Sequence, residues 1–370
     1  MYPDYTKSIV NIVSAIANKF EVSHRYKSLF DISQKKNVVL VAIDGLGFEW
    51  LQKYGKGSFL QTHVKDSVTS TFPSTTTVAM STYLYGVPGQ QTGLTGWYMY
   101  AKEFAGVITP LPFVSMIGSP LFVDREELFP SRTFAQTLPV STWTIYPRDI
   151  IADEFRMKKD RFWHHGSFPD MVKKIKEATQ DTNRQKFIFA YWSEFDILCH
   201  KHGIQSSKVK EHFHHMDAQI SKLVHSLKDT TLIITADHGL INTPKSRMID
   251  VSKDTKLSYC LTLPLTGEPR TAFAYVRAGM EKQFLHEMTK YNYACDVVKS
   301  STLLKQQVFG LQKPHPRLHE RIGDYCLIAK ENYSFADVTV NEKKASVYRA
   351  NHGGTSSWEM KVPFILIETE

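Results

Sequence analysis

The chain has 370 residues, of which 42% are hydrophobic and 22% are charged, and its formal net charge is +8. These values exclude a disordered or low-complexity chain, no apolar run approaches the roughly 20 residues of a membrane-spanning helix, and the dispersed basic residues indicate no specific nucleic-acid binding. The length exceeds the size at which one hydrophobic core usually stops growing, so we expect one large domain with a smaller insertion.

Short apolar runs rich in β-branched residues are typical of buried parallel strands, and they occur at residues 38–43, 140–146, 187–192, 232–235 and 364–367. Helical patterns lie between them, most clearly at 209–227, where the apolar residues fall on one face. This alternation predicts an α/β fold with a largely parallel central sheet and helices on both faces.

Residues 250–345 break this rhythm, because short strand-like pieces alternate there with loops rich in Pro, Lys and His. We therefore expect an inserted capping subdomain at 250–345 and an α/β catalytic core formed by 1–249 and 346–370. Within the insertion, Arg270 precedes a strand-like piece, where its guanidinium could clamp a phosphate with two hydrogen bonds.

Ionisable residues follow three of the predicted strands. Asp44 follows the first, where capping of the next helix explains it about as well. Asp196 and His200 follow the third, and their spacing of four puts both on one helical face, from which they can converge on a cation. Asp237 and His238 follow the fourth, where burial of such a pair is costly unless a metal ion compensates the charge.

A glycine-rich loop before the last strand adds His352. Ligands of open α/β sheets collect at the carboxyl ends of the strands, so we expect the three acids and three histidines at one edge. Six ligands are too many for one tetrahedral zinc and suit two cations about 4 Å apart that share a substrate. In the same loop, Ser356 and Glu359 have the spacing of a helix capping box, which is a structural role.

Hydroxyl residues stand directly before an apolar helical run in the stretch TSTFPSTTTVAMSTYLYG. One or more of them is expected to cap that helix. The N-terminal end of a helix also binds anions, through free N–H groups and the positive end of the dipole. A threonine at this position would meet a phosphate and the cations at once.

Separate segments of the chain together resemble the alkaline phosphatase superfamily, most closely its type I phosphodiesterase/nucleotide pyrophosphatase family: AIDGLG, FPSTTTVAMSTYLYG, EFDILCHKHG, TADHG and NHGG. Their order and spacing match from about Val38 to the last predicted strand. In that family the nucleophile lies ten residues before the glycine that ends its helix. Counting back from Gly86 implies Thr76, with Thr75 as the neighbour to test next.

The resemblance also implies two divalent cations and divides the ligands between them. One cation is surrounded by Asp44, Thr76, Asp237 and His238, and the other is held by Asp196, His200 and His352. Zinc is the metal that such proteins usually carry, and manganese occurs in relatives.

The implied activity is hydrolysis of a phosphodiester or pyrophosphate bond through a phosphothreonine intermediate, with a nucleotide as the default small-molecule substrate. Two alternatives stay open. One is a phosphomonoesterase or phosphomutase that uses the same two-metal site, and the other is a non-catalytic binding protein of the same fold. The sequence indicates neither the residues that bind the rest of the substrate nor the oligomeric state.

The cysteines are widely spaced and include no C-x-x-C pair, so they predict neither a disulfide framework nor a cysteine zinc site. The apolar residues near the N-terminus have helical spacing and do not form an unbroken signal core. We therefore expect a cytoplasmic protein.

Overall fold

A seven-stranded sheet forms the centre of the molecule. The computed structural model describes residues 1–147, 161–181, 184–336 and 348–370. The strand order in the sheet is β2 (Val64–Thr69), β18 (Lys361–Glu368), β9 (Thr230–Thr235), β1 (Asn37–Ile43), β8 (Lys186–Trp192), β6 (Ser141–Pro147) and β7 (Arg161–His165). All strands from β9 to β7 are parallel. The predicted α/β class with a largely parallel sheet is confirmed.

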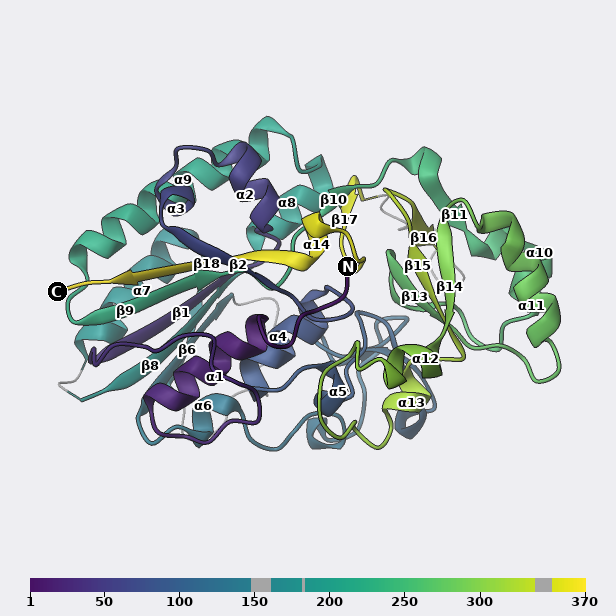
Figure 1. The fold of residues 1–370 in the computed structure, drawn as a ribbon, viewed down its shortest axis with the longest axis horizontal. Helices are drawn as coiled ribbons and strands as arrows, with labels where there is room; N and C mark the ends of the chain where they lie inside the picture. The colour runs from purple at the N-terminus through teal and green to yellow at the C-terminus, as the bar shows by residue number, and fades with distance from the viewer. Residues whose placement is uncertain (148–160, 182–183, 337–347) are drawn as a thin grey trace.

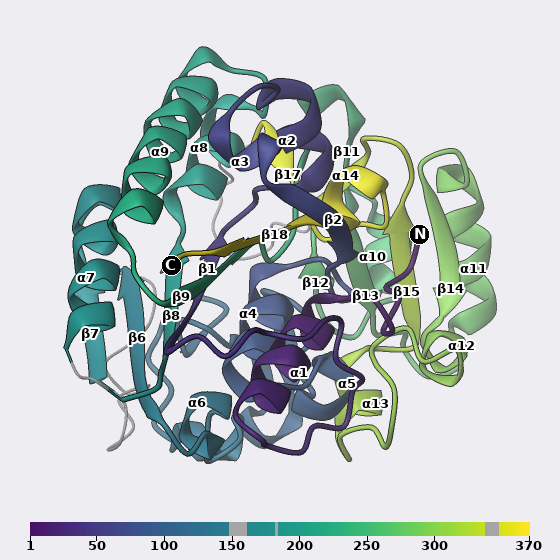
Figure 2. The same cartoon turned by 60° about the vertical axis from the view of Figure 1, so that its left-hand side comes forward.

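Helices cover both faces of this sheet (Figures 1 and 2). One face carries α2 (Phe48–Tyr54), α3 (Phe59–Thr62), α7 (Phe168–Gln180), α8 (Glu194–His202) and α9 (Ser207–Ser226). The other carries α1 (Ile9–Lys19), α4 (Thr76–Tyr85), α5 (Gly89–Thr92) and α6 (Phe134–Thr137). Because β1 and β8 are covered on both sides, every one of their residues is buried, which explains their continuous apolar sequences.

The sequence predicted that the last strand is parallel to its neighbours, and this was wrong. β18 is antiparallel to both β9 and β2. The chain enters β18 directly from the short helix α14 (Ser357–Met360), beside the carboxyl end of β9. A parallel strand would need a crossover to the opposite edge of the sheet, and no residues are available for one here.

The strands β2 and β7 had no counterpart in the sequence prediction. Both lie at the edges of the sheet, where only one neighbour pairs with each strand. Their residues are partly exposed, so they lack the continuous apolar run by which buried strands are recognised.

A second, antiparallel sheet lies at the opposite end of the molecule from the C-terminus (Figure 1). Its order is β12 (Thr266–Glu268), β13 (Thr271–Ala274), β15 (Tyr325–Ala329) and β14 (Cys295–Lys299). Around it lie α10 (Thr255–Tyr259), α11 (Glu281–Met288), α12 (Ser300–Lys305) and α13 (Leu318–Arg321). The sheet falls within the segment 250–345 that was expected to be inserted, of which residues 337–345 lie outside the described residues.

The second sheet has an apolar core of its own, in which Leu257, Phe284 and Leu327 are buried together. A further cluster joins Phe273 of β13 to Phe72, which precedes α4. The two sheets are therefore connected by packing close to the helix that carries the predicted nucleophile.

Shorter pairings complete the described structure. A three-stranded sheet contains β3 (Met99–Ala101), β4 (Gly106–Thr109) and β5 (Val114–Ser115). Two-stranded pairs join β10 (Ile241–Asn242) to β17 (Ala350–Asn351) and β11 (Met248–Asp250) to β16 (Ser334–Ala336).

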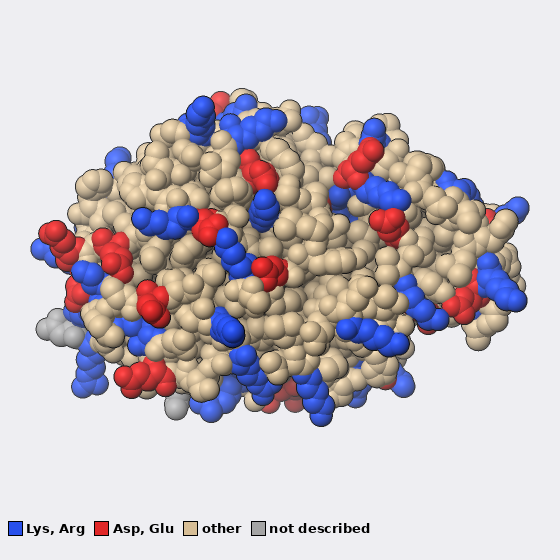
Figure 3. All heavy atoms as spheres, in the orientation of Figure 1, with Lys and Arg blue, Asp and Glu red and all other residues tan. Residues whose placement is uncertain are grey.

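The surface mixes charges of both signs. In Figure 3, lysine and arginine side chains are scattered among acidic ones over the visible face and do not gather in one patch. Within the described ranges, every helix is too short or too polar to cross a bilayer.

Candidate metal centre and nucleophile

Two of the predicted acids lie just beyond the carboxyl ends of neighbouring central strands. Asp44 directly follows β1, and Asp237 follows β9. Asp237 Oδ1 accepts hydrogen bonds from the backbone N–H groups of Gly45 (3.0 Å) and His238 (2.9 Å). Its second oxygen, Oδ2, is buried without a hydrogen-bond partner among the described residues. The backbone therefore fixes this carboxylate and leaves one oxygen free.

Asp44 repeats this arrangement with a side-chain donor. The hydroxyl of Tyr191, on β8, donates to Asp44 Oδ2, whereas Oδ1 is buried and has no hydrogen-bond partner in the described part of the chain. Burial raises the pKa of Asp44 well above its ordinary value, and the negative charges of Asp237 and Asp196 raise it further. A neighbouring cation would relieve both effects.

Asp196 and His200 lie one turn apart on α8, as their spacing predicted. His200 Nε2 is 3.1 Å from Asp196 Oδ2, and Asp196 Oδ1 is another buried oxygen that no described donor reaches. His200 Nδ1 lies 2.7 Å from the carbonyl oxygen of Ala350, which can only accept, so Nδ1 carries the proton. Burial opposes protonation of His200, but the Asp196 carboxylate outweighs it, and the pKa is raised.

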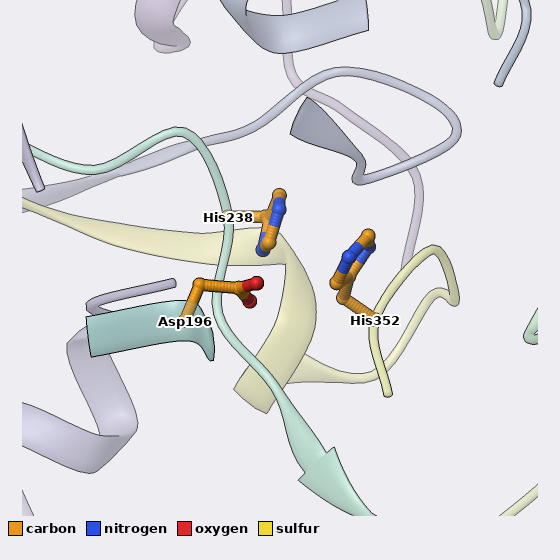
Figure 4. Close-up of side chains that lie close together, drawn as sticks. All are labelled: Asp196, His238 and His352. Carbon is orange, nitrogen blue, oxygen red and sulfur yellow. The ribbon is translucent and has the colours of Figure 1, made fainter. Parts of the chain in front are cut away.

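His352 completes the cluster from the loop after β17. Its ring stacks on that of His238, with centroids 3.9 Å apart, and lies 5.1 Å from the ring of His200. Figure 4 shows the imidazoles of His238 and His352 beside the Asp196 carboxylate. Burial and the neighbouring His238 lower the pKa of His352 well below its ordinary value, so the ring is neutral and able to bind a metal ion.

Two groups of side chains have the geometry of cation sites. Potential ligand atoms lie within 4.8 Å of one another in the group Asp44, Asp237 and His238 and in the group Asp196, His238 and His352. His238 thus belongs to both groups, although the resemblance had placed it at one cation only. His200 belongs to neither group, although its Nε2 lies 3.1 Å from Asp196 Oδ2. All six predicted acids and histidines meet at one edge of the sheet.

The tautomer of His238 supports a cation at this place. Its Nδ1 is 3.2 Å from the Gly239 carbonyl oxygen, so the proton lies there and Nε2 presents a lone pair. That lone pair faces Asp44 Oδ1 at 3.4 Å and Asp237 Oδ2 at 3.5 Å. Three electron-rich atoms directed at one another in a buried site fit a divalent cation between them.

Thr76, the first residue of α4, faces the same atoms. Its Oγ1 lies 3.0 Å from His238 Nε2. Thr75, the alternative nucleophile, is fully buried, and its hydroxyl donates to Glu268 of β12. The expected capping role was wrong: Thr75 occupies the N-cap position, but its side chain makes no cap hydrogen bond. Thr76 therefore has the better placement to react.

A sequence profile of the type I phosphodiesterase/nucleotide pyrophosphatase family matches residues 38–355. The chain belongs to this family. It thus has the enzyme class expected from the sequence, a phosphohydrolase, and the resemblance to the alkaline phosphatase superfamily is confirmed.

Two relatives and two solved structures are similar to the chain over most of its length. Bis(5'-adenosyl)-triphosphatase ENPP4 of Bos taurus is 24% identical over 352 residues, covering 89% of this chain and 71% of that protein. The Mus musculus protein of the same name is also 24% identical and covers 92% of this chain and 73% of its own length.

Among solved structures, an inactive variant of murine ectonucleotide pyrophosphatase/phosphodiesterase 5 in complex with AMP has a TM-score of 0.69. It is 17% identical, and the match covers 90% of this chain and 87% of that one. Phosphonoacetate hydrolase from Sinorhizobium meliloti has a TM-score of 0.67 at 16% identity, with 91% of each chain covered. At these identities the likeness shows a common fold.

Two further expectations from the sequence were wrong, and the same ion pair explains both. Arg270 does not face the site as a phosphate clamp, because its Nε and Nη2 donate to the two oxygens of Glu359 at 2.9 and 3.0 Å. Glu359 accepts from the Ser356 hydroxyl and from Gly354 N–H, and no reciprocal capping box forms. Both members of the ion pair are buried.

Sequence reasoning missed two neighbours of the site, Tyr191 and Glu268. Tyr191 carries a hydroxyl at the carboxyl end of a buried strand, a signal that could have been read beside Asp44. Glu268 lies in the second sheet, and nothing in its sequence context predicts contact with α4. Burial raises the pKa of Glu268 to about 7, although hydrogen bonds from Thr75 and Trp97 act in the opposite direction.

Proposed function

We propose that this protein hydrolyses phosphodiester or pyrophosphate bonds, with Thr76 as the nucleophile, at a site that holds two divalent cations. One observation carries the proposal. Asp44, Asp196 and Asp237 each keep one buried oxygen free of hydrogen-bond partners in the described structure, next to the hydroxyl of a residue at a helix N-terminus. Buried carboxylates without compensation are costly, and cations would remove that cost.

The donor set favours zinc, with manganese as the alternative. Carboxylate oxygens and imidazoles suit either metal, and the lowered pKa of His352, which keeps its ring neutral, favours zinc. We assign Asp44, Thr76, Asp237 and His238 to one cation and Asp196, His200 and His352 to the other. For His200 this requires only that a cation take the place between its Nε2 and the Asp196 carboxylate.

The residues of the chain suggest a two-step reaction. Bound cations would lower the pKa of the Thr76 hydroxyl and neutralise the phosphoryl oxygens. Thr76 Oγ1 attacks phosphorus, so a bond from Oγ1 to phosphorus forms while the bond to an alcohol or nucleoside phosphate breaks. Water then hydrolyses the phosphothreonine and restores the Thr76 hydroxyl. The first-turn N–H groups of α4 bind the non-bridging oxygens.

Nucleotides, including dinucleoside polyphosphates, are the substrate class that we propose. The support is membership of the family and the bis(5'-adenosyl)-triphosphatase activity for which the ENPP4 relatives are named. Exposed aromatic rings near the site could contact a nucleobase. The ring centroid of Tyr348 lies 4.5 Å from that of His200, and Tyr98 directly follows Trp97, whose backbone N–H donates to Glu268. Aromatic faces stack on any base.

Turnover of paired chromogenic substrates tests the bond preference. We expect the zinc-loaded protein to hydrolyse the p-nitrophenyl ester of thymidine 5′-monophosphate faster than p-nitrophenyl phosphate. Dominant activity on the monoester would favour a phosphomonoesterase or phosphomutase instead. The nucleoside and nucleotide products formed from this ester and from a dinucleoside polyphosphate are then quantified to identify the leaving group.

Metal analysis separates an enzyme from a non-catalytic binding protein of the same fold. We expect reconstituted protein to retain close to two zinc or manganese ions per chain after removal of free metal. Clearly less than one ion, together with no turnover of either ester, would favour the binding protein.

Two further expectations remain proposals. We propose that 250–345 forms a subdomain inserted into a core of 1–249 and 346–370, since the second sheet has its own apolar cluster.

We also propose a cytoplasmic location, which four free and buried cysteines support because reducing compartments preserve thiols. Fractionation of the native cells checks the location, and recovery outside the cytoplasm would refute it.

A further inference from the structure

The turn between β12 and β13 brings two buried ionisable residues from the second sheet to the predicted nucleophile. Glu268 ends β12 and is 6% exposed, and Arg270, two residues later, is 1% exposed. The backbone of this turn is fixed from the side, because Gly267 and Tyr98 exchange two backbone hydrogen bonds. Its side chains can therefore hold other segments in place.

Glu268 connects the turn to the start of α4. Its Oε1 accepts hydrogen bonds from the Thr75 hydroxyl and from Trp97 N–H, the latter at 2.7 Å. Thr75 is the N-cap residue of α4 and directly precedes Thr76. A threonine at the N-cap normally turns its oxygen to the N–H of the second or third helical residue. Here the hydroxyl donates to Glu268 and makes no such bond.

The same turn also touches the loop that carries His352. Gly353 has a φ of +101°, and a Cβ added to it would lie 2.5 Å from Glu268 Cβ, so the loop packs directly on the glutamate. Arg270 holds Glu359, which in turn accepts from Gly354 N–H at 2.8 Å. Glu268 therefore has a fixed position between the nucleophile helix and this loop.

We propose that Glu268 is a positioning residue that keeps the Thr75 hydroxyl away from the first turn of α4. The inference rests on the proposed function for its meaning, since the N–H groups kept open in this way would bind the phosphoryl oxygens. Without Glu268, the Thr75 hydroxyl is free to rotate and cap α4, and it then competes with phosphate for those donors. The carboxylate acts through Thr75 and does not touch the reacting atoms.

Binding of inorganic phosphate to the zinc-loaded protein tests this directly, because titration calorimetry requires no turnover. Since a helix cap is worth about 1 kcal/mol, Glu268→Ala should weaken phosphate binding by about fivefold and lower kcat/KM to match. Glu268→Gln keeps an acceptor oxygen for Thr75 and should restore most of the affinity. Glu268→Asp keeps the charge but shortens the reach and should behave like alanine.

A double-mutant cycle distinguishes this role from general support of the fold. In the Thr75→Val background, which has no hydroxyl to cap α4, Glu268→Ala should change phosphate affinity by less than about twofold. An undiminished loss of about fivefold in that background would overturn the proposal, as would a glutamine variant that is folded, binds zinc and is as impaired as alanine. Should Glu268→Ala lose its fold, the aspartate and glutamine variants give the same comparison.

Glu281→Ala serves as the matched control. Glu281 also accepts a hydrogen bond from a hydroxyl, that of Tyr325 in the second sheet, but it lies on α11. The control should bind phosphate like the parent protein. A parent protein that binds phosphate but hydrolyses no ester refutes the proposed function. An equal effect of Glu268→Ala on phosphate binding with and without the Thr75 hydroxyl refutes the role of Glu268.

Discussion

At the scale of single residues, the site depends on which oxygen of each carboxylate is held by the protein. Asp237 is held by two backbone N–H groups and Asp44 by the Tyr191 hydroxyl, so in each case the remaining oxygen points to a fixed place. Metal ligands are usually oriented by such outer partners. The reactive hydroxyl of Thr76 is fixed more simply, by its position at the start of α4.

Replacement of Thr76 tests the nucleophile. We expect Thr76→Ala to lower kcat by at least about 1,000-fold, because the covalent route is lost while the fold and most of the bound metal remain. Steady-state kinetics and metal analysis of the same samples measure both effects. Thr76→Ser, which keeps an oxygen at the site, should retain part of the activity. An alanine variant with full activity would move the assignment to Thr75 or end the covalent mechanism.

Replacement of Tyr191 tests the support of Asp44. Tyr191→Phe removes the hydroxyl that donates to Asp44 Oδ2 and should reduce zinc affinity or activity by about 10- to 100-fold. Competition with a zinc chelator measures the affinity. Tyr146→Phe is the control. The ring centroids of Tyr146 and Tyr191 are 5.5 Å apart, and the buried hydroxyl of Tyr146 has no hydrogen-bond partner among the described residues. Equal zinc affinity in the two variants would show that the Tyr191 hydroxyl does not support the site.

At the scale of elements, the site lies where two sheets meet. The acids and histidines lie on segments that follow β1, β8, β9 and β17, and β12 and the turn after it reach the start of α4 and α14. The glycine after His238 packs closely against α14. A Cβ on Gly239 would lie 2.1 Å from the carbonyl oxygen of Trp358, so a close approach, and not a special turn conformation, requires glycine there.

The Arg270–Glu359 pair should therefore be costly to break. Arg270→Met leaves Glu359 buried without its partner, which should lower the free energy of unfolding by about 3–5 kcal/mol and reduce zinc retention. Urea unfolding measures the first effect and metal analysis the second. The exposed pair of Arg247 and Glu331 gives the comparison, since Arg247→Met should cost less than about 1 kcal/mol. Similar costs for both variants would contradict a structural role of the buried pair.

Local patterns explain how much of the fold could be predicted from the sequence. Continuous apolar runs identified β1, β8 and β9, and helical periodicity identified α9, because burial on both faces or on one face leaves a direct mark on the sequence. The direction of β18 left no such mark, since it depends on where the preceding loop ends. The contact of Glu268 with Thr75 joins residues far apart in the chain, and neither residue is unusual in its own segment.

At the scale of the whole molecule, buried acids make stability depend on pH. The pKa of Glu268 is raised from 4.5 to about 7, so the stability that its neutral form contributes is fully present below about pH 4.5 and is lost as the pH rises through about 7. In the metal-free protein, Asp44 changes stability in the same direction because its pKa is also raised.

Comparison of the parent protein with Glu268→Gln isolates the contribution of Glu268 to the pH dependence of stability. Glutamine stays neutral, so the free energy of unfolding of this variant should rise relative to the parent protein by about 3 kcal/mol between pH 4.5 and 7. Urea unfolding of both metal-free proteins at several pH values measures this difference. A difference that stays constant over this range would show that Glu268 titrates as an exposed carboxylate does.

The position of β18 affects the order in which the protein can fold during synthesis. β2 is made early, yet its one partner in the central sheet is β18, near the far end of the chain. The ribosome must therefore translate through residue 368 before the edge formed by β9 is covered and β2 gains a ladder of hydrogen bonds. Until then the nascent chain exposes an unpaired apolar strand edge, which is a hazard for aggregation and a natural point for a chaperone to bind.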